Sequence, residues 1–206
     1  MAEKANKVKF NLKNTHYSLL TISEDGTPTF GTPVPMPGSV SISLDANGEP
    51  ENFYADGGVY YVINNNCGYD GDLELALIPE SFRTDVLKET LDSKGVLIEN
   101  SEVELAAFAL LFEFDGDQKH IRHVLYNCSA SRPGIEGKTN EDSKEVQTEK
   151  LSLKAVPLTN GMVKAKTGNT TDATTYADWY KAVYVPVAEN DAAMQSAAKP
   201  AKSVKE

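Results

Sequence analysis

The chain has 206 residues, about the length of one domain, and its 40% hydrophobic content excludes wholesale disorder. The net charge of −10 argues against tight nonspecific binding to nucleic acid and against docking on an anionic membrane, because both need a basic surface. The charge is unevenly distributed, since 17 acidic and three basic residues lie between Asp45 and Asp117. The rest of the chain is therefore mildly basic.

The N-terminal segment shows the first strand pattern. Val8, Phe10 and Leu12 alternate with polar residues, as in a strand with one buried face. No apolar stretch of the kind found in a signal peptide precedes them, so we expect the protein to be made and to stay in a cytoplasm. In that compartment Cys67 and Cys128 are expected to remain free thiols.

Alternation with a period of two dominates the chain and predicts half-buried strands. The clearest alternating segments are residues 39–45, 72–77 and 150–155. Residues 105–114 are apolar on both faces, end at the turn pair Asp115-Gly116 and lead into a β-rich stretch at 120–128. This arrangement predicts a hairpin. We expect its first strand to lie in the centre of a sheet and to be covered on each side.

Two segments have helical spacing. The first opens at Pro79 and is expected to stop at Gly95, and the second covers residues 172–184 with Asp172 as its N-cap. Together with the strands they predict a mainly β fold. We expect two packed antiparallel sheets, a β-sandwich, with one or two short flanking helices.

Segments rich in Gly, Pro and Asn predict three loops, at residues 25–38, 64–71 and 134–145. Residues 1–186 are expected to form the folded domain. The last segment, 187–206, is rich in Ala, Lys and Ser and contains no aromatic residue, so we expect a flexible tail.

No motif for catalysis or for a cofactor stands out. His120 and His123 have the spacing of a metal-binding pair, but an offset of three on a strand directs them to opposite faces. Gly134 to Thr139 contains a Gly-Lys-Thr, but Arg132 occupies the first glycine position of a phosphate-binding loop.

The paired acids Asp70 and Asp72, like Asp115 and Asp117, lack the spacing of a calcium-binding loop and are expected in solvated turns. We therefore predict no catalytic residue, no cofactor and no metal site, and we expect a structural protein rather than an enzyme.

Several blocks of sequence resemble, in order, the phi-thirteen-type family of phage major tail proteins. The blocks are VKFNLKNTHY (8–17), FGTPVPMPG (30–38), FYADG (53–57), GYDGDLELALIP (68–79), FALLFEFDG (108–116) and RHVLYNC (122–128). The similarity extends over roughly residues 7 to 185, and the order and spacing of the blocks carry more weight than any single block.

The resemblance implies a tail tube subunit that forms hexameric rings, stacked around a tape-measure protein, in a long non-contractile tail. It implies a β-sandwich with a flanking helix, in which strands of six subunits join around a lumen. The implied partners are copies of the chain itself, the tape-measure protein and other tail proteins. DNA passes through the lumen without adhering, no membrane is involved, and the protein is located in the virion tail after assembly in the host cytoplasm.

An acidic lumen would repel phosphate and let DNA slide. The candidates for lining it are the polar positions of two alternating strands, namely Ser39, Ser41, Ser43, Asp45, Asp72 and Glu74. An ordinary solvated sheet face explains the same pattern equally well.

Two other function classes remain open. A β-sandwich module that binds a ligand such as carbohydrate would need an exposed aromatic platform, for which Tyr60, Tyr61 and Trp179 are the candidates. A hydrolase with dispersed carboxylates is the second alternative.

Overall fold

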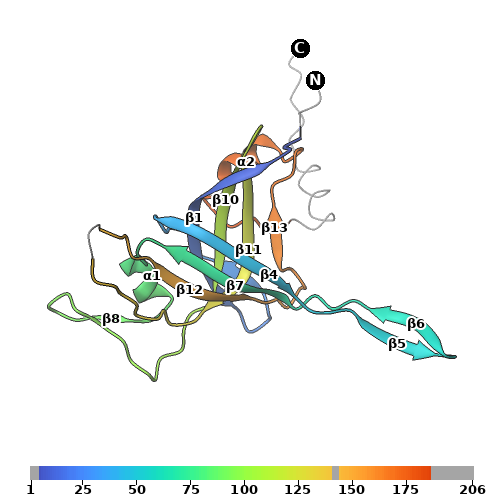
Figure 1. The fold of residues 1–206 in the computed structure, drawn as a ribbon, viewed down its shortest axis with the longest axis horizontal. Helices are drawn as coiled ribbons and strands as arrows, with labels where there is room; N and C mark the ends of the chain where they lie inside the picture. Colours follow the sequence, from blue (N-terminus) through green and yellow to red (C-terminus); the bar gives the residue numbers. More distant parts are fainter. Residues whose placement is uncertain (1–4, 141–143, 187–206) are drawn as a thin grey trace, which may run out of the picture.

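A computed structural model describes residues 5–140 and 144–186 of the chain. These residues form a nine-stranded antiparallel sheet, two small hairpins and two short helices (Figure 1). The strand order is β2-β1-β10-β11-β12-β7-β4, with β3 paired to β1 and β13 paired to β11. The strands of this sheet are β1 (Lys9–Ile22), β2 (Pro28–Phe30), β3 (Val34–Pro35), β4 (Ser39–Asn47), β7 (Gly68–Leu75), β10 (Phe108–Gly116), β11 (Ile121–Ala130), β12 (Glu149–Ala155) and β13 (Lys164–Lys166).

The large sheet bends so that its two halves face each other. One half contains β1, β10 and β11, the other contains β12, β7 and β4, and the pairing of β11 with β12 joins them. Where β4 begins, it approaches β1, and the Ser39 hydroxyl donates a 2.6 Å hydrogen bond to Thr15 Oγ1. The mainly β, antiparallel fold with short helices is confirmed. The two packed layers are halves of one continuous sheet rather than separate sheets.

Strand β10 is covered on both faces, as the sequence predicts. Phe108, Leu110 and Phe112 belong to the main core between the two sheet halves. Ala109 and Leu111 belong to a second core on the outer side of β1, β10 and β11. The predicted hairpin of β10 with β11 is confirmed, and its strands pair from Phe108 with Cys128 to Phe114 with Ile121.

One of the two helices closes the main core. Helix α1 (Glu80–Asp85) inserts Phe82 between the rings of Tyr17 and Phe108, with centroids 5.2 and 5.3 Å away. Three residues after the end of the helix, Lys88 has a φ of 60°, which is incompatible with helical geometry. The helix therefore ends well before Gly95, where the sequence predicted its end.

Helix α2 (Ala173–Asp178) lies beside the second core. Its predicted N-cap is confirmed, because Oδ1 of Asp172 accepts hydrogen bonds from the backbone N–H groups of Thr174 and Thr175 at 3.0 and 2.9 Å. The helix is shorter than predicted. Beyond it, Trp179 and Val183 are buried in the second core, and Trp179 is 2% exposed. Within the described residues, no helix has the length and apolar character needed to cross a bilayer.

A buried ion pair connects β10, β11 and the segment after α2. Glu113, 1% exposed, accepts a 3.0 Å hydrogen bond from Nε of Arg122 and a 2.6 Å hydrogen bond from Asn14. The Arg122 guanidinium lies 3.9 Å from the ring centroid of Tyr176, and the Tyr180 hydroxyl donates to Glu113 at 3.3 Å. Such a pair holds its neighbours in one arrangement, because either charge alone would be buried without a partner.

Two of the predicted loops contain strands instead. Residues 25–38 include β2 and β3, which pair with the edge of β1, where a proline that lacks an N–H is tolerated. Gly68 and Gly71, expected in a loop, belong to β7, and so do Asp70 and Asp72. A Cβ on Gly71 would lie 1.9 Å from the Ser43 carbonyl oxygen, so glycine serves close backbone approach here rather than a turn.

The third predicted loop has no helix or strand in residues 134–140 and 144–145, and residues 141–143 lie outside the described part. The predicted tail, 187–206, also lies outside it. Cys67 is exposed, Cys128 is buried, and both are free thiols, as predicted.

Because the backbone of Ser43 lies so close to Gly71, any side chain at position 71 should lower the stability of the fold. We expect Gly71→Ala to lower the free energy of unfolding by about 1–3 kcal/mol or more, because the neighbouring backbone must shift. Urea unfolding followed by circular dichroism measures this change. Gly58→Ala is the matched control, since its added Cβ would meet nothing within 4 Å, and it should change stability by less than about 0.5 kcal/mol. Equal effects of the two substitutions would contradict this account of β7.

Candidate functional site

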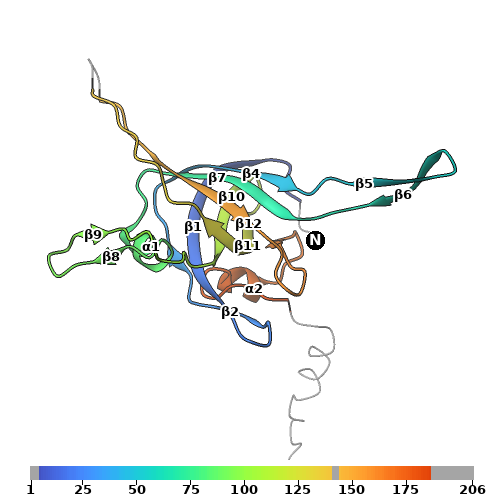
Figure 2. The same cartoon turned by 90° about the horizontal axis from the view of Figure 1, so that it is seen from below.

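The most prominent feature outside the core is a hairpin that projects from the body. It consists of β5 (Glu51–Ala55) and β6 (Gly58–Ile63), and Figures 1 and 2 show it extending well beyond the end of β4 and β7. We call residues 51–63 the arm. Its two-residue turn, Asp56-Gly57, has φ values of 51° and 79°, as the type I′ turn of a tight hairpin requires.

The arm exposes large apolar side chains on both of its faces. Phe53 pairs with Tyr61 on one face, and Tyr54 pairs with Val59 on the other. Seven large apolar side chains of the arm are between 43% and 70% exposed, and they are Phe53, Tyr54, Val59, Tyr60, Tyr61, Val62 and Ile63. No other segment of the described chain exposes so many together, so the arm is the principal candidate for an interaction surface.

The root of the arm is tightly built. The Cys67 N–H donates a 2.9 Å hydrogen bond to the Asn47 carbonyl, which joins the two chain segments where they leave the sheet. Gly48 has a φ of 110°, and a Cβ there would lie 2.6 Å from the Asn65 carbonyl oxygen. Only glycine fits this position without distortion. The arm is thus anchored to the end of β4 and β7.

The arm was not among the predicted elements. The signal was present in the sequence, because Asp56-Gly57 lies between two segments rich in aromatic and β-branched residues, and this is a strong short-range indication of a hairpin.

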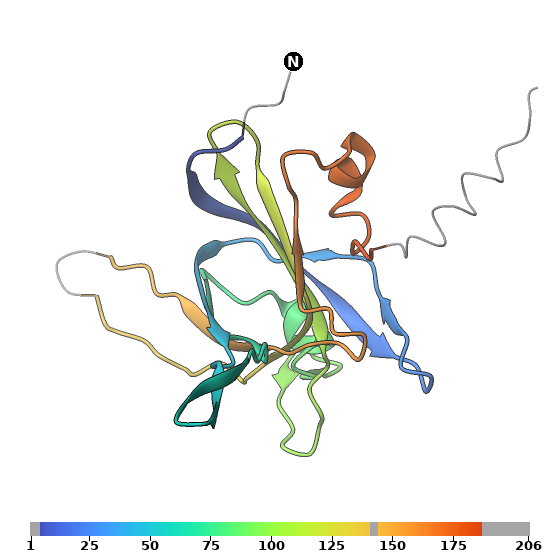
Figure 3. The same cartoon turned by 90° about the vertical axis from the view of Figure 1, so that its right-hand side faces the viewer.

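The second hairpin, β8 (Thr90–Leu91) with β9 (Leu97–Ile98), is smaller. In Figure 3 this hairpin also extends from the body, in another direction than the arm.

Five of the six predicted lumen residues share one polar face. In the antiparallel pair of β4 and β7, Ser41 lies opposite Glu74 and Ser43 opposite Asp72. Asp45 continues the same alternation along β4. The Ser41 hydroxyl donates a 2.8 Å hydrogen bond to Glu74, so the two strands are linked across this face.

Ser39 does not belong to this face. A bulge at Val40 shifts the register, so that Ser39 pairs with the buried Leu75 and its hydroxyl faces Thr15. A bulge adds one residue to one strand and thereby reverses the alternation beyond it. The prediction that Ser39 shares a face with Ser41 is therefore wrong.

Strand β12 adds positive charge to the polar face. Lys150 lies opposite Glu74, and its ammonium is 2.9 Å from Asp72. The pKa of the Asp72 carboxyl is lowered by hydrogen bonds from Lys150 and Ser152, and that of Glu74 by hydrogen bonds from Thr148 and Ser41. Both carboxyls therefore stay ionised at neutral pH, but on a surface of mixed charge.

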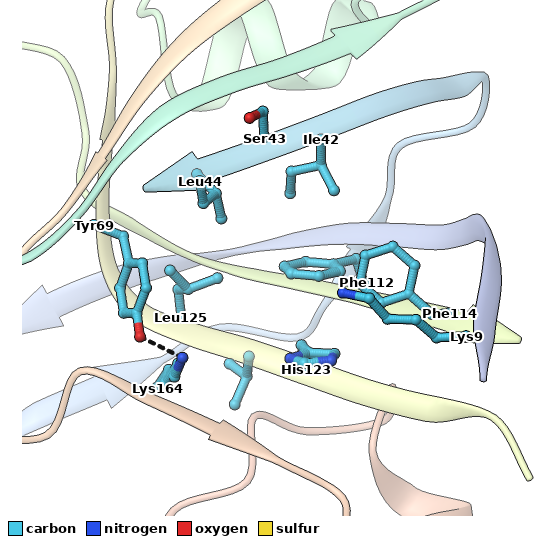
Figure 4. A pocket seen from close by; sticks show the side chains of 11 residues that line it. Lys9, Ile42, Ser43, Leu44, Tyr69, Phe112, Phe114, His123, Leu125 and Lys164 are labelled. Atoms are coloured by element: carbon cyan, nitrogen blue, oxygen red, sulfur yellow. Dashed lines mark hydrogen bonds between the residues drawn. The ribbon is translucent and has the colours of Figure 1, made fainter. Parts of the chain in front are cut away.

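A groove opens where the two halves of the sheet diverge. Figure 4 shows Ile42 and Leu44 of β4 facing Phe112 and His123 across it. Its free volume is about 340 Å³. The lining consists of Lys9, Ile42, Ser43, Leu44, Tyr69, Phe112, Phe114, His123, Val124, Leu125 and Lys164, and none of them is a carboxylate.

Two lysines lie over aromatic rings at the rim of the groove. Nζ of Lys9 is 4.5 Å from the ring centroid of Phe114. Nζ of Lys164 is 4.2 Å from the ring centroid of Tyr69 and donates a hydrogen bond to its hydroxyl (Figure 4). The groove therefore combines an apolar floor with a cationic rim.

The residues weighed for chemistry are dispersed. His120 precedes β11 and is 2.6 Å from Asp115, whereas His123 stacks on Phe112 in the groove. Within the described residues, no group of three or more His, Cys, Asp or Glu side chains is placed to hold a metal ion. Trp179 is buried and cannot form an aromatic platform, which leaves Tyr60 and Tyr61 on the arm.

The comparisons with known proteins assign this chain to no family. No family model matches the sequence, and no curated protein matches it. A solved structure of the cap that terminates the tube of an anti-feeding prophage is similar with a TM-score of 0.44 and 6% sequence identity, over 80% of this chain and 95% of that chain. A likeness this low carries no argument about function.

His123 predicts a pH dependence of stability. Burial, reinforced by Lys166, Lys9 and Lys164, lowers its pKa from 6.5 to about 4. The unfolded chain therefore binds more protons between these two values, and stability falls as the pH decreases through this window. At pH 5 the loss is about 2 kcal/mol relative to pH 8.

The measurement compares urea unfolding of the wild type and of His123→Gln at pH 8 and pH 5. The variant cannot titrate at this position, so it should lose about 2 kcal/mol less than the wild type. If both proteins lost the same stability, the proposed neutral His123 would be wrong.

Proposed function

We propose that this protein is a structural subunit of a phage tail that assembles with copies of itself into stacked hexameric rings. The rings form a tail tube through which DNA passes into the host. The observation that carries the proposal is the arm, whose large apolar side chains are exposed on both faces among the described residues. The resemblance to phage major tail proteins supplies the identity of the assembly.

An uncovered arm is an unstable element by itself. A two-stranded hairpin without further packing is marginal in water. Contact with another subunit removes its apolar surface from water and stabilises both the hairpin and the assembly. The tight anchoring of the arm at Gly48 keeps it extended for such a contact.

The edges of the large sheet support the same proposal. Strand β4 lies at the end of the strand order, and within the described residues it pairs only with β7. An open edge presents unpaired backbone groups that can bind another strand. Joining such edges in a closed ring leaves no edge free for uncontrolled aggregation.

The polar face of β4, β7 and β12 is the candidate surface for the lumen. Ser41, Ser43, Asp45, Asp72 and Glu74 provide hydroxyl and carboxylate groups on it. Carboxylates repel phosphate, and Lys150 is already paired with Asp72, so DNA slides without adhering.

The remaining parts of the proposal follow from this role. The protein is not an enzyme, needs no cofactor, assembles in the host cytoplasm and ends in the virion tail. Its partners are the tape-measure protein and other tail proteins, and it does not act at a membrane. A carbohydrate-binding module remains the second candidate, favoured only by the exposed Tyr60 and Tyr61.

Self-assembly predicts rings or tubes from purified protein at high concentration, seen by light scattering and negative-stain electron microscopy. The double variant Phe53→Ser/Tyr61→Ser should remain monomeric, because it removes one apolar face of the arm. Val96→Ser is the matched control, since Val96 is 54% exposed on the other hairpin, compared with 56% for Phe53. A wild type that stays monomeric and binds glycans through Tyr60 and Tyr61 would support the second candidate instead.

A lumen role for the polar face predicts a charge effect on DNA passage. Phages carrying Asp72→Lys/Glu74→Lys should form normal tubes but eject DNA more slowly, because phosphate then adheres to the wall. Real-time ejection, followed by a DNA-binding dye, measures the rate. The variant Asp72→Asn/Glu74→Gln keeps the hydrogen-bond acceptors and should give an intermediate rate. Normal ejection by the lysine variant would place the face outside the lumen or make its charge irrelevant.

A further inference from the structure

The groove between β4 and the β10–β11 hairpin opens at the margin of the main core. Its floor is apolar, two lysines flank it, and no carboxylate of the described chain lines it. We propose that this groove receives the arm of a second copy of this chain. The inference rests on the proposed self-assembly and specifies which surfaces meet.

Charge complementarity identifies the occupant. The arm and its root carry Glu49, Glu51 and Asp56, and no lysine or arginine occurs between residues 46 and 82. The groove carries Lys9 and Lys164, and Lys166 lies opposite His123 in the pairing of β13 with β11. An acidic apolar hairpin and a cationic apolar groove attract each other and exclude wrong pairings of like charge.

The arm and the groove also both carry aromatic side chains. The arm presents Phe53, Tyr60 and Tyr61 with exposed rings. The groove offers the stacked rings of Phe112 and His123, whose centroids are 5.1 Å apart. Lys9 and Lys164 already lie over aromatic faces, so they are placed to contact a further ring or a carboxylate from the arm.

The arm that fills the groove belongs to another copy. In Figures 1 and 2 the arm leads away from the body of its own chain, and within residues 5–140 and 144–186 its strands pair only with each other. The arm and the groove are different surfaces, so their contact is head-to-tail. A head-to-tail contact closes into a ring or extends into a filament, depending on its rotation.

Two complementary defects test the pairing. Phe53→Ser/Tyr61→Ser disables the arm and leaves the groove, whereas Lys9→Glu/Lys164→Glu disables the groove and leaves the arm. Each variant alone should lose rings and tubes, but an equimolar mixture should form heterodimers in sedimentation velocity, because one intact arm and one intact groove remain. Lys94→Glu/Lys138→Glu changes the net charge equally at exposed sites outside the groove, and it should assemble like the wild type.

Cross-linking tests the same contact where association is weak. In a Cys67→Ser background, a chain with Ala55→Cys in the arm is mixed with a chain carrying Leu44→Cys at the groove and is then oxidised. Disulfide-linked dimers should exceed by several-fold those from Val96→Cys mixed with Leu44→Cys. Cys128 is buried and does not interfere.

The outcomes separate this inference from the proposed function. If the wild type forms tubes, while the groove variant assembles equally well and cross-linking does not exceed the control, the arm–groove pairing is overturned and self-assembly stands. If heterodimers and cross-links form, the pairing is supported, even where the wild type makes no tubes and the tube function fails. If the wild type stays monomeric and no cross-links form, both proposals are wrong.

Discussion

Burial of β10 on both faces is the interaction on which the rest of the fold depends. Phe108, Leu110 and Phe112 need cover on one side, and Ala109 and Leu111 need cover on the other. A single flat sheet cannot supply both. The sheet therefore bends over the first face, while the segment around Trp179 closes the second. The open edge of β4 and the groove beside it are consequences of this bend, since the sheet halves meet at Thr15 and Ser39 but diverge farther along.

Features encoded in neighbouring residues were predictable from the sequence. The β10–β11 hairpin follows from the apolar run at 105–112 and the turn pair Asp115-Gly116 shortly after it, and the N-cap of α2 follows from Asp172. The alternation of β4, β7 and β12 was equally local. It placed five candidate lumen residues on one face without any knowledge of their neighbours.

Features set by distant backbone were not predictable. Gly71 carries no local sign that Ser43 approaches it, so a glycine that permits close packing of strands resembles one in a turn. The sequence around Val40 likewise gives no sign of a bulge, yet the bulge moves Ser39 to the opposite face. The lysines of β12 that lie among the acids of β7 come from a segment about 80 residues away along the chain. The groove assembles residues from six strands and has no sequence signature at all.

The structure shows which surfaces carry the unevenly distributed charge of the chain. The acidic middle segment supplies the arm and most of the polar face, whereas the mildly basic ends supply Lys9, Lys150, Lys164 and Lys166. Within one chain, Lys150 reaches the acids of β7, but Lys9 and Lys164 at the groove face no carboxylate among its lining residues. The arm, for its part, is acidic and has no basic residue of its own. The head-to-tail contact that we propose would bring these separated charges together, because it places the acidic arm of one copy against the lysines of another. Opposite charges then favour this orientation over contacts between surfaces of like charge.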